Sequence, residues 1–285
     1  MLWDREAGVV RLGGGGTWLE GPAWVGDRVL VSDIPGNRVL AWSEGGDELE
    51  IALAPAEFCN GRTVARDGRV YQCSHGRRAV EELFPDLATV VVVDRTPSGT
   101  RLNSPNDVVV SRDGSLWFSD PPYGILKPEE GYPGDLEYGA CHVFRLDPSG
   151  VLTAVVTDMG HPNGLAFSPD EAVLYVADTS SALGGTGRHV RAYDVASGSC
   201  TGGRDFYVGR AGLIDGFRVD VEGRCWFSDG DTVVVVGPDG SVLDTIPIPE
   251  RVANVCFGPD GWLFVAATTS LYRLRTTTSD AALAG

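Results

Sequence analysis

The sequence predicts an all-β protein, a six-bladed β-propeller with four antiparallel strands per blade around a central channel. Three observations support this fold class. One short phrase repeats six times along the 285 residues, successive copies begin 38 to 57 residues apart, and sustained helical periodicity is missing. Repeats of about 40–50 residues that each hold several short strands are typical of β-propellers.

Each copy of the phrase consists of a polar residue, a short apolar run, a turn with an acidic residue, and a second apolar run. The copies begin at Glu20, Asn60, Asn106, Asn163, Asp215 and Ala253. In four copies glycine follows the acidic residue, at Asp67, Asp113, Glu222 and Asp260. Asp-Gly between two β-rich runs is a strong hairpin signal. We therefore expect each copy to form a β-hairpin.

Further apolar and β-branched runs follow most copies, such as RVLAWSEGG at 38–46 and TVVVVDRTPSG at 89–99. They add a third and a fourth strand to each hairpin, which gives six blades in one domain that spans residues 1–285. Only the segment 77–88 has a spacing that could hold a turn of helix, and Pro85 limits its length. This pattern disfavours an alternating βαβ fold.

The composition excludes several classes of protein. A net charge of −16 disfavours nucleic-acid partners, because their binding depends on Lys and Arg at the phosphates. The first ten residues lack a basic-then-apolar leader, and no apolar run approaches 18 residues, so we expect a cytoplasmic protein without a membrane partner. The six cysteines form no C-x-x-C pair, which favours buried reduced thiols over a zinc or redox site.

The first residues of the six phrases form a candidate site. In a propeller the innermost strands surround the channel, so these residues should meet at one mouth, and five of the six carry side-chain oxygens. Asn and Asp before Gly are also common turn residues, but turns alone do not require two carboxylates among three amides. Oxygen ligands without His or Cys favour hard cations such as Ca²⁺, Mg²⁺ or Mn²⁺.

Five stretches resemble a known family. They are EGPAW from Glu20, LNSPNDVVV from Leu102, LWFSDPPYG from Leu116, HPNGLAFSPD from His161 and IDGFRVD from Ile214. In this order they resemble the gluconolactonase and luciferin-regenerating-enzyme family of six-bladed β-propeller lactonases, over residues 20 to 270. The resemblance implies one divalent cation, with Ca²⁺ favoured and Mg²⁺, Mn²⁺ or Zn²⁺ as alternatives.

Carried over position by position, the resemblance assigns the metal ligands to Glu20, Asn163 and Asp215 and a substrate-binding role to Asn106. The animal branch of the family has an arginine two residues before that asparagine, where this chain has Ser104, and Arg101 lies further upstream. In CSHGRRAV, Ser74 replaces the glutamate that usually precedes the histidine. We take three further residues as candidate substrate contacts: Asn60, His75 and Arg101.

The resemblance implies a small-molecule lactone substrate and an enzyme that opens gluconolactone- or xylonolactone-like rings. The cation would polarise the carbonyl, and Asp215 is the candidate general base for the attacking water. Two alternatives stay open. One is a calcium-stabilised binding module without catalysis, and the other is an aryl-ester or phosphotriester hydrolase that uses the same metal site. The segment 123–140, rich in Pro, Gly and acidic residues, is either a lid or a solvated loop.

Overall fold

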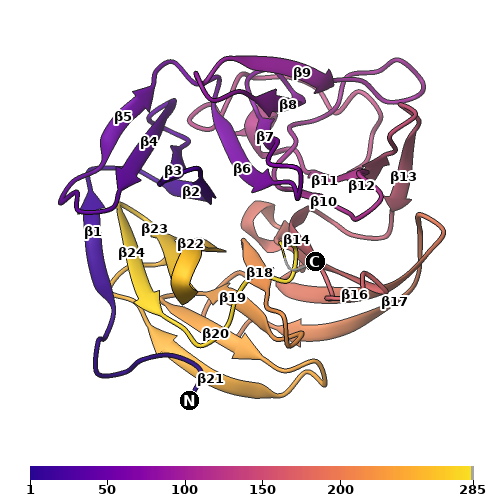
Figure 1. Cartoon of the computed structure of the whole chain (residues 1–285). Coiled ribbons are helices and arrows are strands. Elements are labelled where there is room, and N and C mark those ends of the chain that lie inside the picture. The colour runs from indigo at the N-terminus through magenta and orange to yellow at the C-terminus, as the bar shows by residue number, and fades with distance from the viewer. Residues whose placement is uncertain (284–285) are drawn as a thin grey trace.

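The computed structural model describes residues 1–283. In it the chain forms six four-stranded antiparallel sheets around a channel (Figure 1). Blade one contains β2 (Leu19–Val25), β3 (Arg28–Asp33), β4 (Arg38–Ser43) and β5 (Glu50–Leu53). Blade two contains β6 (Cys59–Val64), β7 (Val70–Ser74), β8 (Ala79–Leu83) and β9 (Thr89–Val93). Blade three contains β10 (Val108–Val110), β11 (Leu116–Asp120), β12 (His142–Leu146) and β13 (Leu152–Val156).

The second half of the chain repeats this arrangement. Blade four contains β14 (Pro162–Phe167), β15 (Val173–Asp178), β16 (His189–Ala196) and β17 (Ser199–Val208). Blade five contains β18 (Phe217–Val219), β19 (Cys225–Asp229), β20 (Thr232–Val236) and β21 (Val242–Pro247). Blade six contains β22 (Val252–Phe257), β23 (Trp262–Ala267), β24 (Ser270–Arg275) and, from the other end of the chain, β1 (Val10–Gly14).

The two ends of the chain close the ring. β1 pairs antiparallel with β24, so a strand from the N-terminal part completes the last blade, as the indigo and yellow strands in Figure 1 show. Neighbouring inner strands contact one another around the channel, from β2 through β6, β10, β14, β18 and β22 back to β2. The first strand of each phrase is therefore the innermost strand of its blade.

The turns follow the sequence prediction at the hairpins. Gly68, Gly114 and Gly223 have φ angles of +86°, +83° and +79°, which glycine adopts without steric cost. Each lies in the tight turn between the first two strands of its blade. The expectation of six hairpins with four strands per blade is confirmed.

The turn of helix that the spacing at 77–88 would allow does not form. The segment contains β8, which pairs with β7 on one side and β9 on the other. Ala79, Val80 and Leu83 are buried in this strand. The hydrogen-bonding edge of β7 requires a partner, and that tertiary pairing overrides the local spacing of apolar residues. The described helices are short: α1 (Tyr123–Leu126), η1 (Ser180–Leu183) and η2 (Pro259–Gly261).

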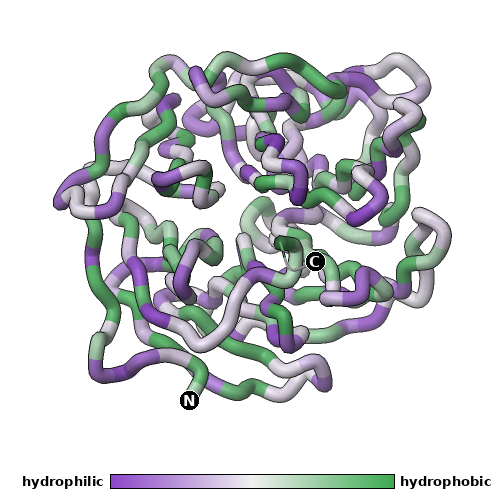
Figure 2. Tube along the Cα trace, viewed as in Figure 1, coloured by the Kyte–Doolittle hydropathy of each residue, from purple (hydrophilic) through white to green (hydrophobic). Residues whose placement is uncertain are grey.

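The hydrophobic core lies between adjacent blades. Trp226 of β19 packs edge-on against Phe257 of β22, with ring centroids 5.8 Å apart. Apolar stretches run along the strands of every blade, and hydrophilic residues interrupt them (Figure 2). All six cysteines are free and five are buried. Across residues 1–283, we find no helix with the length and apolar character needed to cross a membrane.

Candidate active site

The five oxygen-bearing residues of the predicted ring meet around one cavity of about 450 Å³. They project from the starts of the inner strands or from the residues just before them. Other residues complete the lining: Trp18, Ile34, Tyr123, Lys127, Glu130, Thr179, Ala182, Leu213 and Arg251. The sixth phrase starts at Ala253, which is fully buried and does not line the cavity. Its backbone carbonyl accepts a hydrogen bond from the N–H of Gly216 at 2.8 Å.

Glycine after the ring residue lets neighbouring inner strands approach closely. The N–H of Gly61 donates to Asn106 O at 2.8 Å, and the N–H of Gly164 donates to Asp215 O at 3.1 Å. A Cβ atom at Gly61 would overlap Asn106 O, and one at Gly164 would overlap Asp215 O. These glycines therefore bring the ring side chains of adjacent blades together, which explains why Gly follows Glu20, Asn60, Asn163 and Asp215 in the sequence.

Glu20 is a buried carboxylate with no cationic partner. The residue is 5% exposed, and Oε2 accepts hydrogen bonds from the N–H of Gly21 at 2.7 Å and from Nδ2 of Asn254 at 3.0 Å. Within residues 1–283 it forms no ion pair with Lys or Arg. Burial first, and the charge of Asp215 second, raise the pKa of Glu20 well above its usual range.

Asp215 is the second carboxylate in the cavity, and its backbone N–H donates to Ser228 Oγ at 2.9 Å. Burial and then the charge of Glu130 raise the pKa of Asp215, while Arg251, Lys127 and a hydrogen bond from Asn163 act in the opposite direction. Glu20 is buried and Asp215 is half-buried, and two carboxylates that share one cavity repel each other. A bound cation would remove this repulsion.

The amide of Asn163 is oriented by protein contacts. Its Nδ2 donates to Thr179 Oγ1 at 3.1 Å, and Thr179 is held in turn by the Tyr123 hydroxyl, which donates to Thr179 O at 2.9 Å. Oδ1 is therefore the atom of Asn163 that can bind a cation. Together with the two carboxylates it supplies the oxygen donors that Ca²⁺, Mg²⁺ and Mn²⁺ accept.

These residues fit a divalent cation, because the cavity brings together the amide of Asn163 and two carboxylates, neither of which forms an ion pair with Lys or Arg among the described residues. Lys127 and Arg251 line the same cavity. The fit depends on a mixed set of carboxylate and amide oxygens. No cluster of three or more His, Cys, Asp or Glu side chains that could hold a metal occurs in the described part of the chain.

The remaining sequence candidates divide into two groups. Asn106 lines the cavity, is 6% exposed, and its side chain forms no hydrogen bond with described residues. Asn60 also lines the cavity, and its Nδ2 lies 3.1 Å from His75 Nε2. His75 itself lies behind Asn60 and outside the lining. Arg101 is also outside, where its guanidinium donates to Arg77 O at 2.7 Å, so the structure gives no support to Arg101 as a substrate contact.

The sequence pattern did not predict several of the residues that line the cavity. Lys127 and Glu130 form an ion pair at 2.8 Å, and both come from the segment 123–140, so part of this segment covers the site. The guanidinium of Arg251 lies 5.6 Å from the centroid of the Trp18 ring. One signal was available, because Lys127 is the only lysine in the chain. Asn254 gave no signal, since it follows the apolar start of the sixth phrase.

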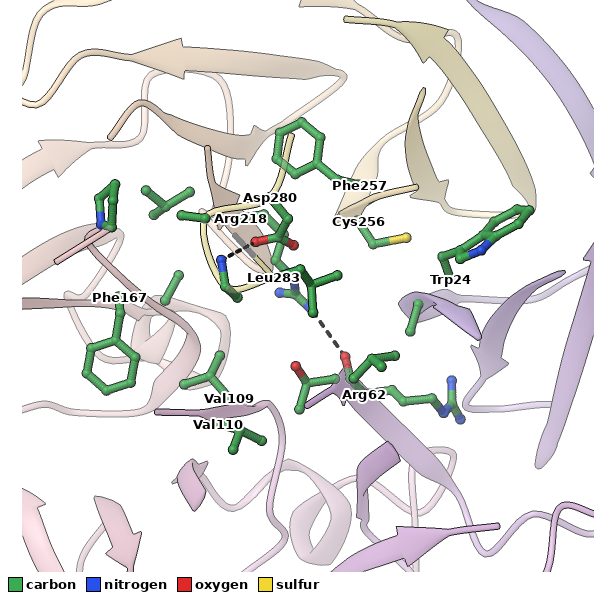
Figure 3. A pocket seen from close by; sticks show the side chains of 18 of the residues that line it. Trp24, Arg62, Val109, Val110, Phe167, Arg218, Cys256, Phe257, Asp280 and Leu283 are labelled. Carbon is green, nitrogen blue, oxygen red and sulfur yellow. Dashed lines mark hydrogen bonds between the residues drawn. The ribbon is translucent and has the colours of Figure 1, made fainter. Parts of the chain in front are cut away.

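A second cavity lies further along the same inner strands, as Figure 3 shows with Trp24, Val109 and Phe167 around it. Its volume is about 50 Å³, enough for water but far below the roughly 300–1,000 Å³ of small-molecule sites. Asp280 and Leu283 of the C-terminal segment lie over it, beside Arg218 (Figure 3). The cavity that the five ring residues line is therefore the candidate active site.

Comparisons with known proteins agree with this geometry. A family model described as the SMP-30/Gluconolactonase/LRE-like region matches residues 18–269. A gluconolactonase from Zymomonas mobilis is 33% identical over 92% of this chain and 79% of its own length, and a pentonolactonase from Haloferax volcanii is 29% identical over 85% and 78%. Among solved structures, a gluconolactonase from Xanthomonas campestris is 39% identical, with a TM-score of 0.88 over 94% of this chain and 89% of that chain. A luciferin-regenerating enzyme shares the fold, with a TM-score of 0.76 at 18% identity over 95% of this chain and 96% of that one.

Proposed function

The chain belongs to the SMP-30/Gluconolactonase/LRE-like family and is a lactonase, and from this premise we propose that it hydrolyses gluconolactone- or xylonolactone-like sugar lactones with one divalent cation. The observation that carries the proposal is the meeting of two carboxylates and three amides around one cavity of about 450 Å³. The relatives named as gluconolactonase and pentonolactonase support the substrate class. The polar lining suits a ligand that carries several hydroxyl groups.

We assign the cation to Glu20, Asn163 and Asp215. When bound there it would act as a Lewis acid on the lactone carbonyl and its oxyanion. The burial of the Glu20 carboxylate supports this assignment, because it forms no ion pair with Lys or Arg among the described residues, and burial raises the pKa of both Glu20 and Asp215. Ca²⁺ is the first choice, since oxygen ligands and a partly open site suit it.

Asp215 is the group that moves the proton. Its carboxylate oxygen accepts a proton from the water that attacks the lactone carbonyl carbon, and it returns that proton to the ring oxygen when the C–O bond breaks. The product is an open-chain hydroxy acid. General-base catalysis by a carboxylate positioned in this way typically contributes about 10²–10⁴-fold to the rate.

Asn106 and Asn60 bind the substrate hydroxyls. The side chain of Asn106 has no partner in the described chain, so both its donor and its acceptor are available to a ligand. Lys127 and Glu130 close one side of the cavity and hold each other at 2.8 Å. Their segment limits the access of bulk water to the lactone.

A lactonase assay with a pH indicator tests the proposal. Glucono-δ-lactone, a xylonolactone and δ-valerolactone would be assayed with the purified protein, after EDTA treatment, and after Ca²⁺, Mg²⁺, Mn²⁺ or Zn²⁺ is restored separately. We expect turnover of the sugar lactones, its loss with EDTA and its recovery with one cation. Asp215→Asn should lower kcat at least 100-fold, whereas Asp27→Asn, a matched change in an exposed turn, should have no effect.

Two results would contradict the proposal. Stabilisation by a cation without turnover of any lactone would favour a binding module. Turnover of phenyl acetate or a phosphotriester in preference to every sugar lactone would favour the aryl-ester or phosphotriester alternative.

A further inference from the structure

His75 contacts the candidate site without lining it. It follows β7, is 1% exposed, and its Nε2 lies 3.1 Å from Nδ2 of Asn60, which lines the cavity. Its other ring nitrogen, Nδ1, lies 3.0 Å from the backbone carbonyl of Glu130. The imidazole therefore connects an inner-strand residue with the segment that carries Lys127 and Glu130.

The hydrogen-bond partners of His75 determine which nitrogen carries the proton. A backbone carbonyl only accepts hydrogen bonds, so Nδ1–H must be the donor to Glu130 O. A neutral imidazole has one N–H, and burial lowers the pKa of His75, which favours the neutral form. Nε2 is then an acceptor, and the amide Nδ2 of Asn60 must donate to it.

This arrangement fixes the amide of Asn60. Since Nδ2 faces His75, Oδ1 is turned away from it, and Oδ1 is buried without a hydrogen-bond partner among residues 1–283. Buried polar atoms in native proteins nearly always have a partner. An unpartnered acceptor on a residue that lines a cavity is therefore available to accept a hydrogen bond from a ligand.

The imidazole itself has little freedom to rotate. Gly124 of α1 lies directly against it, and a Cβ atom at position 124 would fall on Cβ and Cγ of His75. Gly131 lies in turn against the carbonyl of Gly124. The segment 123–131 thus both presents the Glu130 carbonyl to Nδ1 and holds the ring in place.

We propose that His75 is a positioning residue that holds the Asn60 amide with Oδ1 toward the cavity, where it accepts a hydrogen bond from a hydroxyl group of the substrate. This inference rests on the proposed function, because the hydroxyl group is taken to belong to a sugar lactone. The opposite tautomer would turn the amide around and present Nδ2 to the cavity, where it would select a carbonyl or ring oxygen.

Long-range ¹H–¹⁵N spectra of histidine-labelled protein test the tautomer directly. The chain has four histidines, and substitution of the other three (His142→Gln, His161→Gln and His189→Gln) assigns the His75 signal without altering His75. We expect a protonated Nδ1 and an unprotonated Nε2 at neutral pH. An Nε2–H tautomer or an imidazolium would overturn the proposal.

Kinetics test the role of Asn60 Oδ1. His75→Leu leaves Nδ2 of Asn60 without an acceptor. We therefore expect KM for glucono-δ-lactone to rise about tenfold, which corresponds to the loss of one neutral hydrogen bond. The values of kcat and of the cation affinity should change little. His75→Gln, whose Oε1 can replace the acceptor, should restore most of the loss. KM for δ-valerolactone, which has no hydroxyl group, should not change.

An equal rise in KM for both lactones would overturn the proposal, because a general distortion of the site would cause it. If the unmodified protein hydrolyses no lactone, the proposed function fails, and the tautomer measurement still decides the orientation of Asn60.

Discussion

Asn254 of blade six donates its side-chain amide to Oε2 of Glu20 in blade one over 3.0 Å, across the point where the ring of blades closes. Oδ1 of Asn254 accepts the backbone N–H of Val255, which fixes the amide orientation. Gly216 makes room for this side chain, since a Cβ atom there would overlap the Asn254 amide. Asn254 therefore orients the carboxylate that we assign to the cation.

Asn254→Ala should weaken the affinity for the divalent cation by about 10–100-fold, the usual effect of removing a group that orients a metal ligand. The reason is that Oε2 of Glu20 keeps only the N–H of Gly21. Isothermal titration of the EDTA-treated protein with Ca²⁺ measures this. Asn106→Ala, a ring amide without a bond to Glu20, is the matched control and should change the affinity by less than about threefold. Equal losses in both variants would contradict the role of Asn254.

Thr179→Val should weaken the cation affinity by about tenfold. Valine keeps the shape of threonine but cannot accept the hydrogen bond from Nδ2 of Asn163, so the amide becomes free to rotate. The same titration measures the effect. Thr232→Val removes a hydroxyl that bonds Asp229 O at 2.7 Å, outside the residues that line the cavity, and should leave the affinity unchanged. An unchanged affinity in Thr179→Val would mean that Asn163 is held by other contacts.

Glu20→Gln should stabilise the cation-free protein at pH 8 by about 1–2 kcal/mol while it abolishes stabilisation by added cation. Burial raises the pKa of the folded carboxyl above the 4.5 of the unfolded chain, so the charged form destabilises the fold. This destabilisation is absent below pH 4.5, where the carboxyl group is protonated in both the folded and the unfolded protein. It grows as the pH rises toward the pKa of Glu20 in the folded protein.

Urea unfolding between pH 4 and pH 8 measures this difference. The advantage of Glu20→Gln should disappear at the acid end, and Glu6→Gln, an exposed control, should show no such trend. A Glu20→Gln variant that is less stable than the unmodified protein at every pH would contradict the uncompensated charge.

The repeats made most of the fold predictable. Six hairpin phrases with acidic turns predicted the six blades, and the first residues of the phrases predicted five of the cavity residues. The turn of helix that the spacing at 77–88 would allow did not form, because pairing with β7 decided the structure of that segment. Asn254 was not predictable, since it acts on Glu20 from the other end of the chain. Thr179 was not predictable either, since its contact with Asn163 depends on how β14 and β15 pair. His75 was recognised as a site candidate, but its position behind Asn60 follows only from the packing of Gly124.

Lys127 should report on ligands in the cavity. It is the only lysine in the chain, so reductive methylation with ¹³C-formaldehyde labels it and the N-terminal amine alone. We expect gluconate, the product of glucono-δ-lactone, to shift the ¹³C signal of dimethylated Lys127, because its ammonium lines the cavity beside Glu130. Lys127→Arg assigns the signal by removing it. No shift at gluconate concentrations that inhibit turnover would place the substrate elsewhere.

Arg218 connects opposite sides of the channel, and its loss should lower the free energy of unfolding by about 3–5 kcal/mol. It projects from β18, its Nη2 donates to Arg62 O of β6 at 3.1 Å (Figure 3), and its Nη1 lies 3.6 Å from Oδ2 of Asp107. Burial raises the pKa of Asp107, and Arg218 opposes that effect. Arg218→Met therefore leaves a buried carboxylate unpaired.

Combining Arg218→Met with Asp107→Asn should restore part of the stability in urea unfolding, with a coupling of about 1–3 kcal/mol. Arg5→Met, at an exposed ion pair with Asp244, should cost less than about 1 kcal/mol. Additive effects in the double variant would show that Arg218 stabilises the fold through its other contacts, the carbonyls of Arg62 and Phe217 and the charge of Asp280, and not through Asp107.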